Sequence, residues 1–158
     1  MISFIFNLSI ILLIICPMIY LFIVSGKKNN EEINNFKILC QQNNVTLDNT
    51  GQWVCSIIGI DQKQGKLCYK LKSETKDIHL LDVSSIIKCQ IVKEFNTTPQ
   101  VQQGFRSLMN KVSLKLQLSN NEVVLIPLYD ISLSEDPLST LYDAMEWEKI
   151  INKQIGKS

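Results

Sequence analysis

An apolar segment at the N-terminus constrains this chain more than any other feature. Residues 2–24 are almost uninterruptedly apolar and carry no charged side chain. At a rise of about 1.5 Å per residue, a helix of that length crosses a hydrocarbon core of about 30 Å. Pro17 can bend such a helix without preventing it from spanning the bilayer. The sequence therefore predicts one transmembrane anchor, which we place at residues 1–25.

Two kinds of cleaved leader compete with an uncleaved anchor. A signal peptide needs a basic start, a shorter apolar run and small residues before the cut, and this segment has none of them. A lipoprotein signal would use Cys16, but the residue before that cysteine should be small and Ile15 is not. We therefore expect a single-pass protein of the inner or plasma membrane, with the lipid bilayer as one partner.

The basic residues that flank the anchor predict its orientation. Lys27 and Lys28 come directly after the apolar segment, and basic flanking residues tend to stay in the cytoplasm. Glu31 and Glu32 lie close by and weaken this signal. We expect the rest of the chain to face the cytoplasm.

Length and charge constrain the part of the chain beyond the anchor. The chain has 158 residues, which leaves room for one ordinary domain beside the anchor. It has 16 basic and 15 acidic residues, and Arg106 is its single arginine. Because nucleic-acid binders usually carry a basic excess on one face, the composition argues against that class of partner.

The cysteines beyond the anchor indicate buried thiols. Cys40, Cys55, Cys68 and Cys89 show no C-x-x-C spacing, so a structural zinc site is not supported. Outside the cell the same residues would suggest disulfides, whereas in the cytoplasm free cysteines are usually small buried hydrophobic residues. The expected cytoplasmic location favours the second interpretation.

Residues 26–50 are expected to form a juxtamembrane helix and a linker. Within residues 29–44, Ile33, Phe36 and Cys40 show the i, i+3, i+7 spacing of a short amphipathic helix, which could serve as a stalk. Residues 48–51 are rich in turn formers and set the expected boundary of the folded domain, residues 51–158.

Beyond this boundary the hydrophobic period becomes strand-like. The best example is residues 112–118, where Val112, Leu114, Leu116 and Leu118 alternate with polar residues. Pro127 argues that the last strand ends early or lies at a sheet edge. Residues 96–110 are expected to be a loop. The expected strands are residues 53–60, 66–72, 78–81, 86–94, 112–118 and 123–128.

The chain ends in a predicted helix with clear boundaries. Asp136 is a good N-cap residue, Pro137 suits the first helical position, and Gly156 comes after the last apolar residue. We expect an apolar arc with Trp147 at its margin, lying over the sheet. The arc consists of Leu138, Leu141, Tyr142, Ala144, Met145, Ile151 and Ile155. The fold class predicted from these elements is α+β.

A run of antiparallel strands with one amphipathic helix after it resembles the pleckstrin-homology-like superfold, as in bacterial membrane-anchored members. The resemblance is carried by residues 65–71, 78–87 and 144–147 within residues 53–155. It implies a β-barrel or sandwich with one end covered by the helix, and a helix tryptophan, here Trp147, packed on the barrel mouth. A resemblance of fold implies no activity.

Some members of that family bind phosphoinositides through basic residues around the first hairpin loop. Lys63, Lys66, Lys70 and Lys72 occupy a similar place in the sequence. Nearby acidic residues offset their charge, and lysines on the outer face of a strand are usually ordinary solvated residues. A sensor of lipid head groups or of the membrane surface therefore stands as the alternative function.

No catalytic, cofactor-binding or metal-binding constellation is visible. His79 is the chain's one histidine, and its position in a short strand favours a surface or sheet-edge residue. The adjacent acids Glu135 and Asp136 are better explained by capping of the last helix. We therefore expect no enzyme and no cofactor. The leading hypothesis is a membrane-tethered interaction or scaffold module that binds another protein, with the edge near Pro127 as a place for an extended partner.

Overall fold

The computed structural model describes residue 15 and residues 30–74, 78–95, 109–133 and 136–157. The chain divides into two compact units, Met1–Asn35 and Phe36–Ser158. Apart from residue 15, the predicted anchor, residues 2–24, lies outside the described residues. Among the helices that the structure describes, none is both long enough and apolar enough to cross a bilayer.

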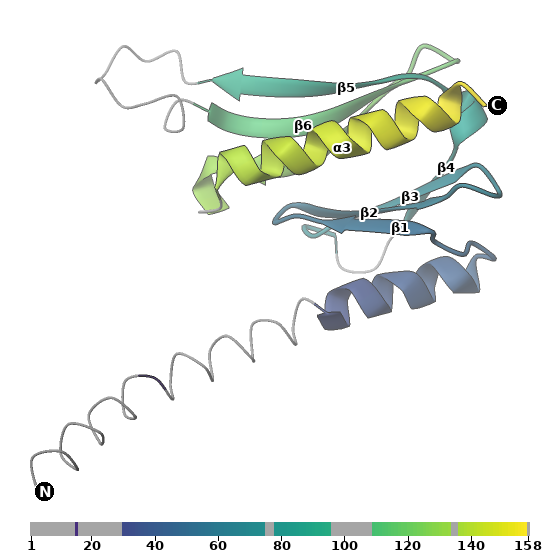
Figure 1. Cartoon of the computed structure of the whole chain (residues 1–158), viewed down its shortest axis with the longest axis horizontal. Helices are drawn as coiled ribbons and strands as arrows, with labels where there is room; N and C mark the ends of the chain where they lie inside the picture. Colours follow the sequence, from purple (N-terminus) through teal and green to yellow (C-terminus); the bar gives the residue numbers. More distant parts are fainter. Residues whose placement is uncertain (1–14, 16–29, 75–77, 96–108, 134–135, 158) are drawn as a thin grey trace, which may run out of the picture. The chain divides into compact units, whose positions relative to one another are not determined.

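The second unit is built from two antiparallel sheets and a C-terminal helix, which confirms the predicted α+β class (Figure 1). One sheet has the order β1-β2-β3-β4, and the other has the order β5-β6-β7. The strands of the first sheet are β1 (Asn49–Gln52), β2 (Ser56–Asp61), β3 (Lys66–Leu71) and β4 (His79–Asp82). Those of the second are β5 (Ile86–Phe95), β6 (Met109–Leu118) and β7 (Val123–Asp130), and the helix is α3 (Pro137–Ile155).

A short 3-10 turn, η1 (Val83–Ser85), carries the chain from the first sheet to the second. The backbone N–H of Val83 donates to the carbonyl of Gly65 in the β2–β3 turn. The carbonyl of Ser85 accepts from the N–H of Ser119, the residue after β6. The crossing is therefore held by backbone bonds to turns of both sheets. A second 3-10 turn, η2 (Ile131–Leu133), comes after β7.

The main core lies between the two sheets and beneath α3. The alternation predicted for residues 112–118 is confirmed, because Val112, Leu114, Leu116 and Leu118 of β6 are all buried in it. In β2, alternation divides the side chains between two clusters: Ile58 belongs to the main core and Ile57 to a second cluster. Both faces of the first sheet are therefore covered.

The second cluster reaches back to residues before the expected domain. It joins Phe36, Cys40 and Val45 to Ile57 of β2 and Cys68 of β3. Residues 30–42 are helical, as expected, but Phe36 and Cys40 are fully buried, which a free stalk would not allow. The second compact unit begins at Phe36, so it includes residues that the sequence assigned to the juxtamembrane helix and linker.

Two sequence expectations near the expected domain boundary were wrong. Residues 48–51 were expected to form a turn, but Asn49–Gln52 is strand β1, paired antiparallel with β2. The expected strand 53–60 begins later, at Ser56, because residues 53–55 make the turn between β1 and β2. Pairing with the apolar strand β2 overrides the weak strand propensity of the polar sequence in β1. Of the expected loop 96–110, residues 109 and 110 belong to β6 and residues 96–108 lie outside the described residues.

Helix α3 has the predicted ends but turns a different face to the core. The side chain of Asp136 accepts a hydrogen bond from the N–H of Leu138, and Gly156 is the C-cap. Trp147 lies within the buried face, whereas Tyr142 and Met145, assigned to the arc, are 70% and 42% exposed. The buried residues recur at alternating spacings of three and four: Pro137, Thr140, Ala144, Trp147, Ile151 and Gln154.

Polar side chains of α3 bind the outer edge of the second sheet. The side chain of Asn152 accepts from the N–H of Cys89 at 3.0 Å and donates to its carbonyl at 2.9 Å. One turn earlier, Glu148 accepts from the N–H of Ile91 at 3.2 Å. The two side chains pair with β5 as a neighbouring strand would, and α3 runs alongside β5 and β6 (Figure 1).

We predict that Asn152→Ala lowers the free energy of unfolding by about 1 to 2 kcal/mol, since two hydrogen bonds to an edge strand are lost. Lys153→Ala is the matched control on the same helical turn, and an exposed residue of that kind should change stability by no more than about 0.5 kcal/mol. Chemical denaturation of both variants measures the difference. Equal midpoints for the two would show that the bonds to Cys89 do not hold α3.

The thiols occupy three different environments. Cys55 lies in the β1–β2 turn and is half-buried, whereas Cys40, Cys68 and Cys89 are buried. A hydrogen bond from the Cys68 thiol lowers the pKa of Cys40, and the same contact together with burial raises the pKa of Cys68. Burial, with a smaller contribution from the charge of Glu148, raises the pKa of Cys89 to about 12. The expectation of buried thiols is confirmed for these three cysteines.

The raised pKa of Cys89 predicts a loss of stability in alkaline solution. In the unfolded chain this thiol ionises near its ordinary pKa of 9.0, whereas in the folded chain it resists ionisation up to about pH 12. Its contribution is therefore complete below pH 9 and is lost as the pH rises toward 12. The free energy of unfolding should fall less steeply over this range in Cys89→Ala than in the wild type or in Cys55→Ala. Parallel curves for all three proteins would contradict the prediction.

Candidate functional site

His79 lies on β4, an edge strand of the first sheet, which agrees with the expected sheet-edge position. Its ring stacks on Tyr69 of β3, with ring centroids 4.7 Å apart and an interplanar angle of 15°. Its Nε2 lies 2.8 Å from a carboxylate oxygen of Glu74. These contacts hold the imidazole against the sheet surface.

The lysines of the lipid-binding alternative do not lie on the first hairpin. Because β1 precedes them, the first hairpin is β1–β2, and its turn, residues 53–55, contains no basic residue. Lys63 lies in the β2–β3 turn, and Lys66 and Lys70 lie on β3. Asp61, the last residue of β2, is buried and accepts hydrogen bonds from the N–H groups of Thr46, Lys63 and Gln64. Asp61 therefore orders the turn and does not act as an exposed counter-charge.

The remaining residues singled out in the sequence do not form a site. Asp136 caps α3, and Glu135 lies outside the described residues. Within the described parts of the chain, no three histidine, cysteine or acidic side chains gather closely enough to hold a metal ion.

The edge near Pro127 is contacted from within the domain. Strand β7 lies at the edge of its sheet, as the proline predicted, although it continues to Asp130 and does not end early. The hydroxyl of Ser56 in β2 donates to the carbonyl of Pro127 at 2.7 Å. An extended partner would have to displace this bond, so the edge beside Pro127 is a poorer docking place than the sequence suggested.

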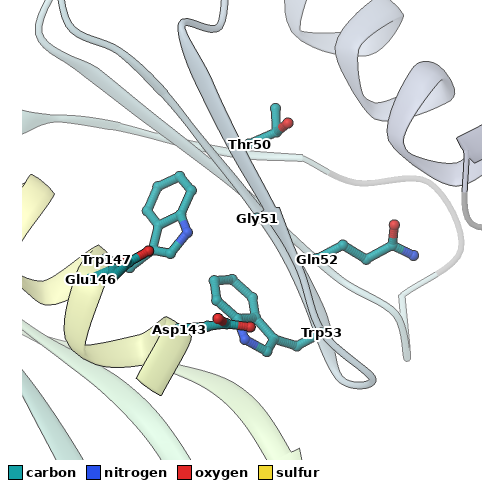
Figure 2. A pocket seen from close by; sticks show the side chains of 7 residues that line it. All are labelled: Thr50, Gly51, Gln52, Trp53, Asp143, Glu146 and Trp147. Carbon is teal, nitrogen blue, oxygen red and sulfur yellow. The ribbon is translucent and has the colours of Figure 1, made fainter. Parts of the chain in front are cut away.

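A small pocket of about 210 Å³ lies between β1, an edge strand of the first sheet, and helix α3 (Figure 2). Strand β1 and the turn after it supply Thr50, Gly51, Gln52 and Trp53, and the helix supplies Asp143, Glu146 and Trp147. Ligand pockets usually measure about 300–1,000 Å³, so this pocket suits a group of side-chain size. In Figure 2 the two indoles lie on the helix side of β1, while the side chains of Thr50 and Gln52 extend from its other side.

Trp53 and Trp147 form the wall of the pocket. They are the chain's two tryptophans, only 5% and 7% exposed, with ring centroids 6.0 Å apart at an angle of 74°. This edge-to-face geometry is the favoured one for aromatic pairs. A Cβ atom at Gly51 would stand 2.5 Å from Nε1 of Trp147, so the close approach of the two elements depends on glycine.

The indole N–H of Trp53 is the unusual feature of this wall. Its Nε1 atom is buried and has no hydrogen-bond partner. Leaving a buried donor unpaired costs about 1–3 kcal/mol, which is why nearly all buried donors in folded proteins are paired. In the view of Figure 2 this nitrogen is on the side of the ring toward Asp143. The wall of the pocket therefore contains a buried donor that lacks an acceptor.

The rim of the pocket is acidic. Asp143 and Glu146 are exposed and one turn apart on α3, and no basic residue lines the pocket. Neither carboxylate forms an ion pair with a residue that the structure describes. The pocket thus combines two negative charges, two aromatic rings and one unpaired N–H donor.

Sequence reasoning did not find this pocket. It assigned Gly51 to a turn, Trp53 to a strand and Trp147 to the margin of the helix, and it did not bring the three together. Two signals were present: the chain has only two tryptophans, and one of them comes two residues after a glycine. What was missing was strand β1, without which Gly51 and Trp53 have no defined position beside α3.

Comparisons of the chain with protein-family models, with curated proteins and with solved structures gave no match.

We predict that Gly51→Ala destabilises the domain by about 1 to 3 kcal/mol, because the added methyl group overlaps the Trp147 ring and forces it to move. The intrinsic fluorescence should change with it, since both tryptophans line the pocket. Gly156→Ala, where the nearest atom to an added Cβ is 3.8 Å away, is the control and should leave the fluorescence unchanged. A Gly51→Ala protein with wild-type fluorescence would argue against the contact.

Proposed function

We propose that this chain is a membrane-tethered interaction module with a pleckstrin-homology-like domain, and that it binds another protein at the pocket between β1 and α3. The observation that carries the proposal is the acidic, indole-lined pocket with the unpaired N–H of Trp53. The tether is the anchor that the sequence predicts at residues 2–24.

The order of elements supports the proposed fold. A four-stranded and a three-stranded antiparallel sheet pack together, and one helix after them contacts both. An antiparallel, β-rich unit followed by one helix is compatible with the proposed fold. The tryptophan expected to pack on the barrel mouth is Trp147, which lies against β1 and the turn after it.

The state of the sheet edges supports the choice of site. Residues 89 and 91 of β5 bind Asn152 and Glu148 of α3, and Pro127 of β7 binds Ser56. A pocket opens beside the edge strand β1. A partner that approaches β1 meets the indoles and the carboxylates without displacing any of these bonds.

The charge distribution disfavours the alternative, a sensor of lipid head groups. Anionic head groups would be repelled by Asp143 and Glu146 at the pocket. The lysines lie instead along the β2–β3 hairpin, and Cys68, on the same face of β3 as Lys66 and Lys70, is buried in the second cluster. A continuous basic surface is therefore interrupted there.

Site-specific photo-crosslinking in the native membrane tests the proposal. The full chain would carry the photo-reactive residue benzoylphenylalanine in place of Glu146, at the pocket, or in place of Glu122, an exposed residue in the β6–β7 turn. We expect a discrete protein adduct from position 146 and none from position 122, because only the first lies at the proposed binding surface.

The products separate the possible functions. A protein adduct at position 146 alone supports the module. Crosslinks to lipid in place of protein at position 146 would replace it with the lipid-sensor alternative. Absence of any adduct at position 146, or equal protein adducts at both positions, would overturn the proposed binding surface.

A further inference from the structure

We infer that the pocket between β1 and α3 recognises a basic side chain, lysine or arginine, presented by an extended segment of the partner protein, together with a backbone carbonyl of that segment. This inference rests on the proposed function and adds the chemistry of the ligand. It combines three independent features of the pocket: its charge, its unpaired donor and its position beside a sheet edge.

The charge of the pocket selects a cation. Asp143 and Glu146 stand one helical turn apart at its rim and have no ion-pair partner among the described residues. Trp53 and Trp147 add aromatic surfaces, and a cation within about 6 Å of an indole face is attracted by the ring quadrupole. An ammonium or guanidinium group can interact with the carboxylates and with the indole rings at the same time.

The unpaired donor selects an acceptor on the same ligand. Neither ammonium nor guanidinium can accept a hydrogen bond, so a bare cation leaves the N–H of Trp53 unsatisfied. A peptide carries a carbonyl acceptor at every residue, close to its side chain. A basic residue within a peptide therefore supplies both groups, whereas a simple amine supplies one.

The edge of β1 explains how the segment is held. The backbone N–H of Trp53, which is distinct from its unpaired indole N–H, donates to the carbonyl of Ser56 across the β1–β2 turn. Residue pairs along an antiparallel ladder alternate between bonded and non-bonded. By this alternation Gly51 and Ile58 are a hydrogen-bonded pair, and Thr50 and Gly59 are a non-bonded pair. The backbone N–H and carbonyl of Thr50 therefore point away from β2, toward the open side of the strand. An added strand can bond to Thr50 and point one side chain into the pocket.

The size of the pocket agrees with this ligand. A volume of about 210 Å³ suits the end of one long side chain, and its polar rim keeps the charged group close to water. The stem of a lysine or arginine can then lie against the apolar indole surfaces while its head reaches the carboxylates.

The test uses the full chain in dodecyl maltoside, a detergent without charge that cannot compete for the site. Blocked tripeptides with valine on both sides of a central lysine, arginine, norleucine or glutamate are the probes, with butylammonium as the bare cation. Because both tryptophans of the chain line the pocket, intrinsic fluorescence reports binding directly. The indole N–H resonance of Trp53, assigned by its loss in Trp53→Phe, reports whether the donor gains an acceptor.

We expect the lysine and arginine peptides to bind about tenfold more tightly than the norleucine peptide, and the glutamate peptide to bind least. Asp143→Asn with Glu146→Gln should weaken the lysine peptide about threefold to fivefold, since the ion pairs are exposed. Glu122→Gln, which removes an exposed charge away from the pocket, is the matched control and should bind as the wild type does. Trp53→Phe should weaken the peptide about fivefold and butylammonium less, because both lose some aromatic attraction but only the peptide also loses a hydrogen bond from the indole.

Each arm can overturn the inference. Equal affinity for the norleucine and lysine peptides would remove the cation requirement. An unchanged Trp53 resonance, or equal losses for peptide and butylammonium in Trp53→Phe, would remove the carbonyl contact. Protein adducts at position 146 in the crosslinking experiment, with no preference for basic peptides here, would leave the interaction module standing and refute only its proposed ligand.

Discussion

Two hydrogen bonds between the side chain of Asn152 and the backbone of Cys89 help to place α3, together with the side chains that the helix buries. An amide side chain has the donor and acceptor of a peptide group, so it can pair with an edge strand where no further strand is present. Because the bonds are directional, they fix the helix along its axis as well as its distance from β5. About one and a half turns nearer the N-terminus of α3, the same register brings Trp147 against Gly51, and that contact creates the pocket.

The same arrangement accounts for the edges of both sheets. A sheet edge exposes unpaired backbone groups, and proteins usually cover such edges or make them short. Here β5 is covered by side chains of α3, β7 is contacted by Ser56, and β1 and β4 have four residues each. Of these devices, a short edge strand is the one that leaves backbone groups accessible, and of the two short strands β1 is the one that lines the pocket described above.

The sequence predicted the elements whose signal is local. The alternation in β6 and the Asp136 and Pro137 signals of α3 rest on neighbouring residues, and the structure confirms both. Features that depend on tertiary contacts were not predictable. Polar β1 is a strand because β2 pairs with it, and the buried face of α3 includes Thr140 and Gln154, which hydrophobicity alone assigns to solvent. The side chain of Gln154 donates to the carbonyl of Gln62, so its burial is compensated by a bond that sequence spacing cannot reveal.

The pocket and the polar groups that line it also depend on tertiary contacts. A hydrophobic pattern indicates that Trp53 and Trp147 are apolar, but it cannot indicate that the indole N–H of Trp53 is buried without an acceptor. Only the helix placement converts Asp143 and Glu146 from ordinary exposed residues of α3 into the rim of a pocket. For the proposed tethered module this local chemistry would be sufficient, because attachment to a bilayer restricts where partners are met. The proposed surface would then have to discriminate among neighbouring proteins, and a combined demand for a cation and a carbonyl would reject ligands that offer only one of them.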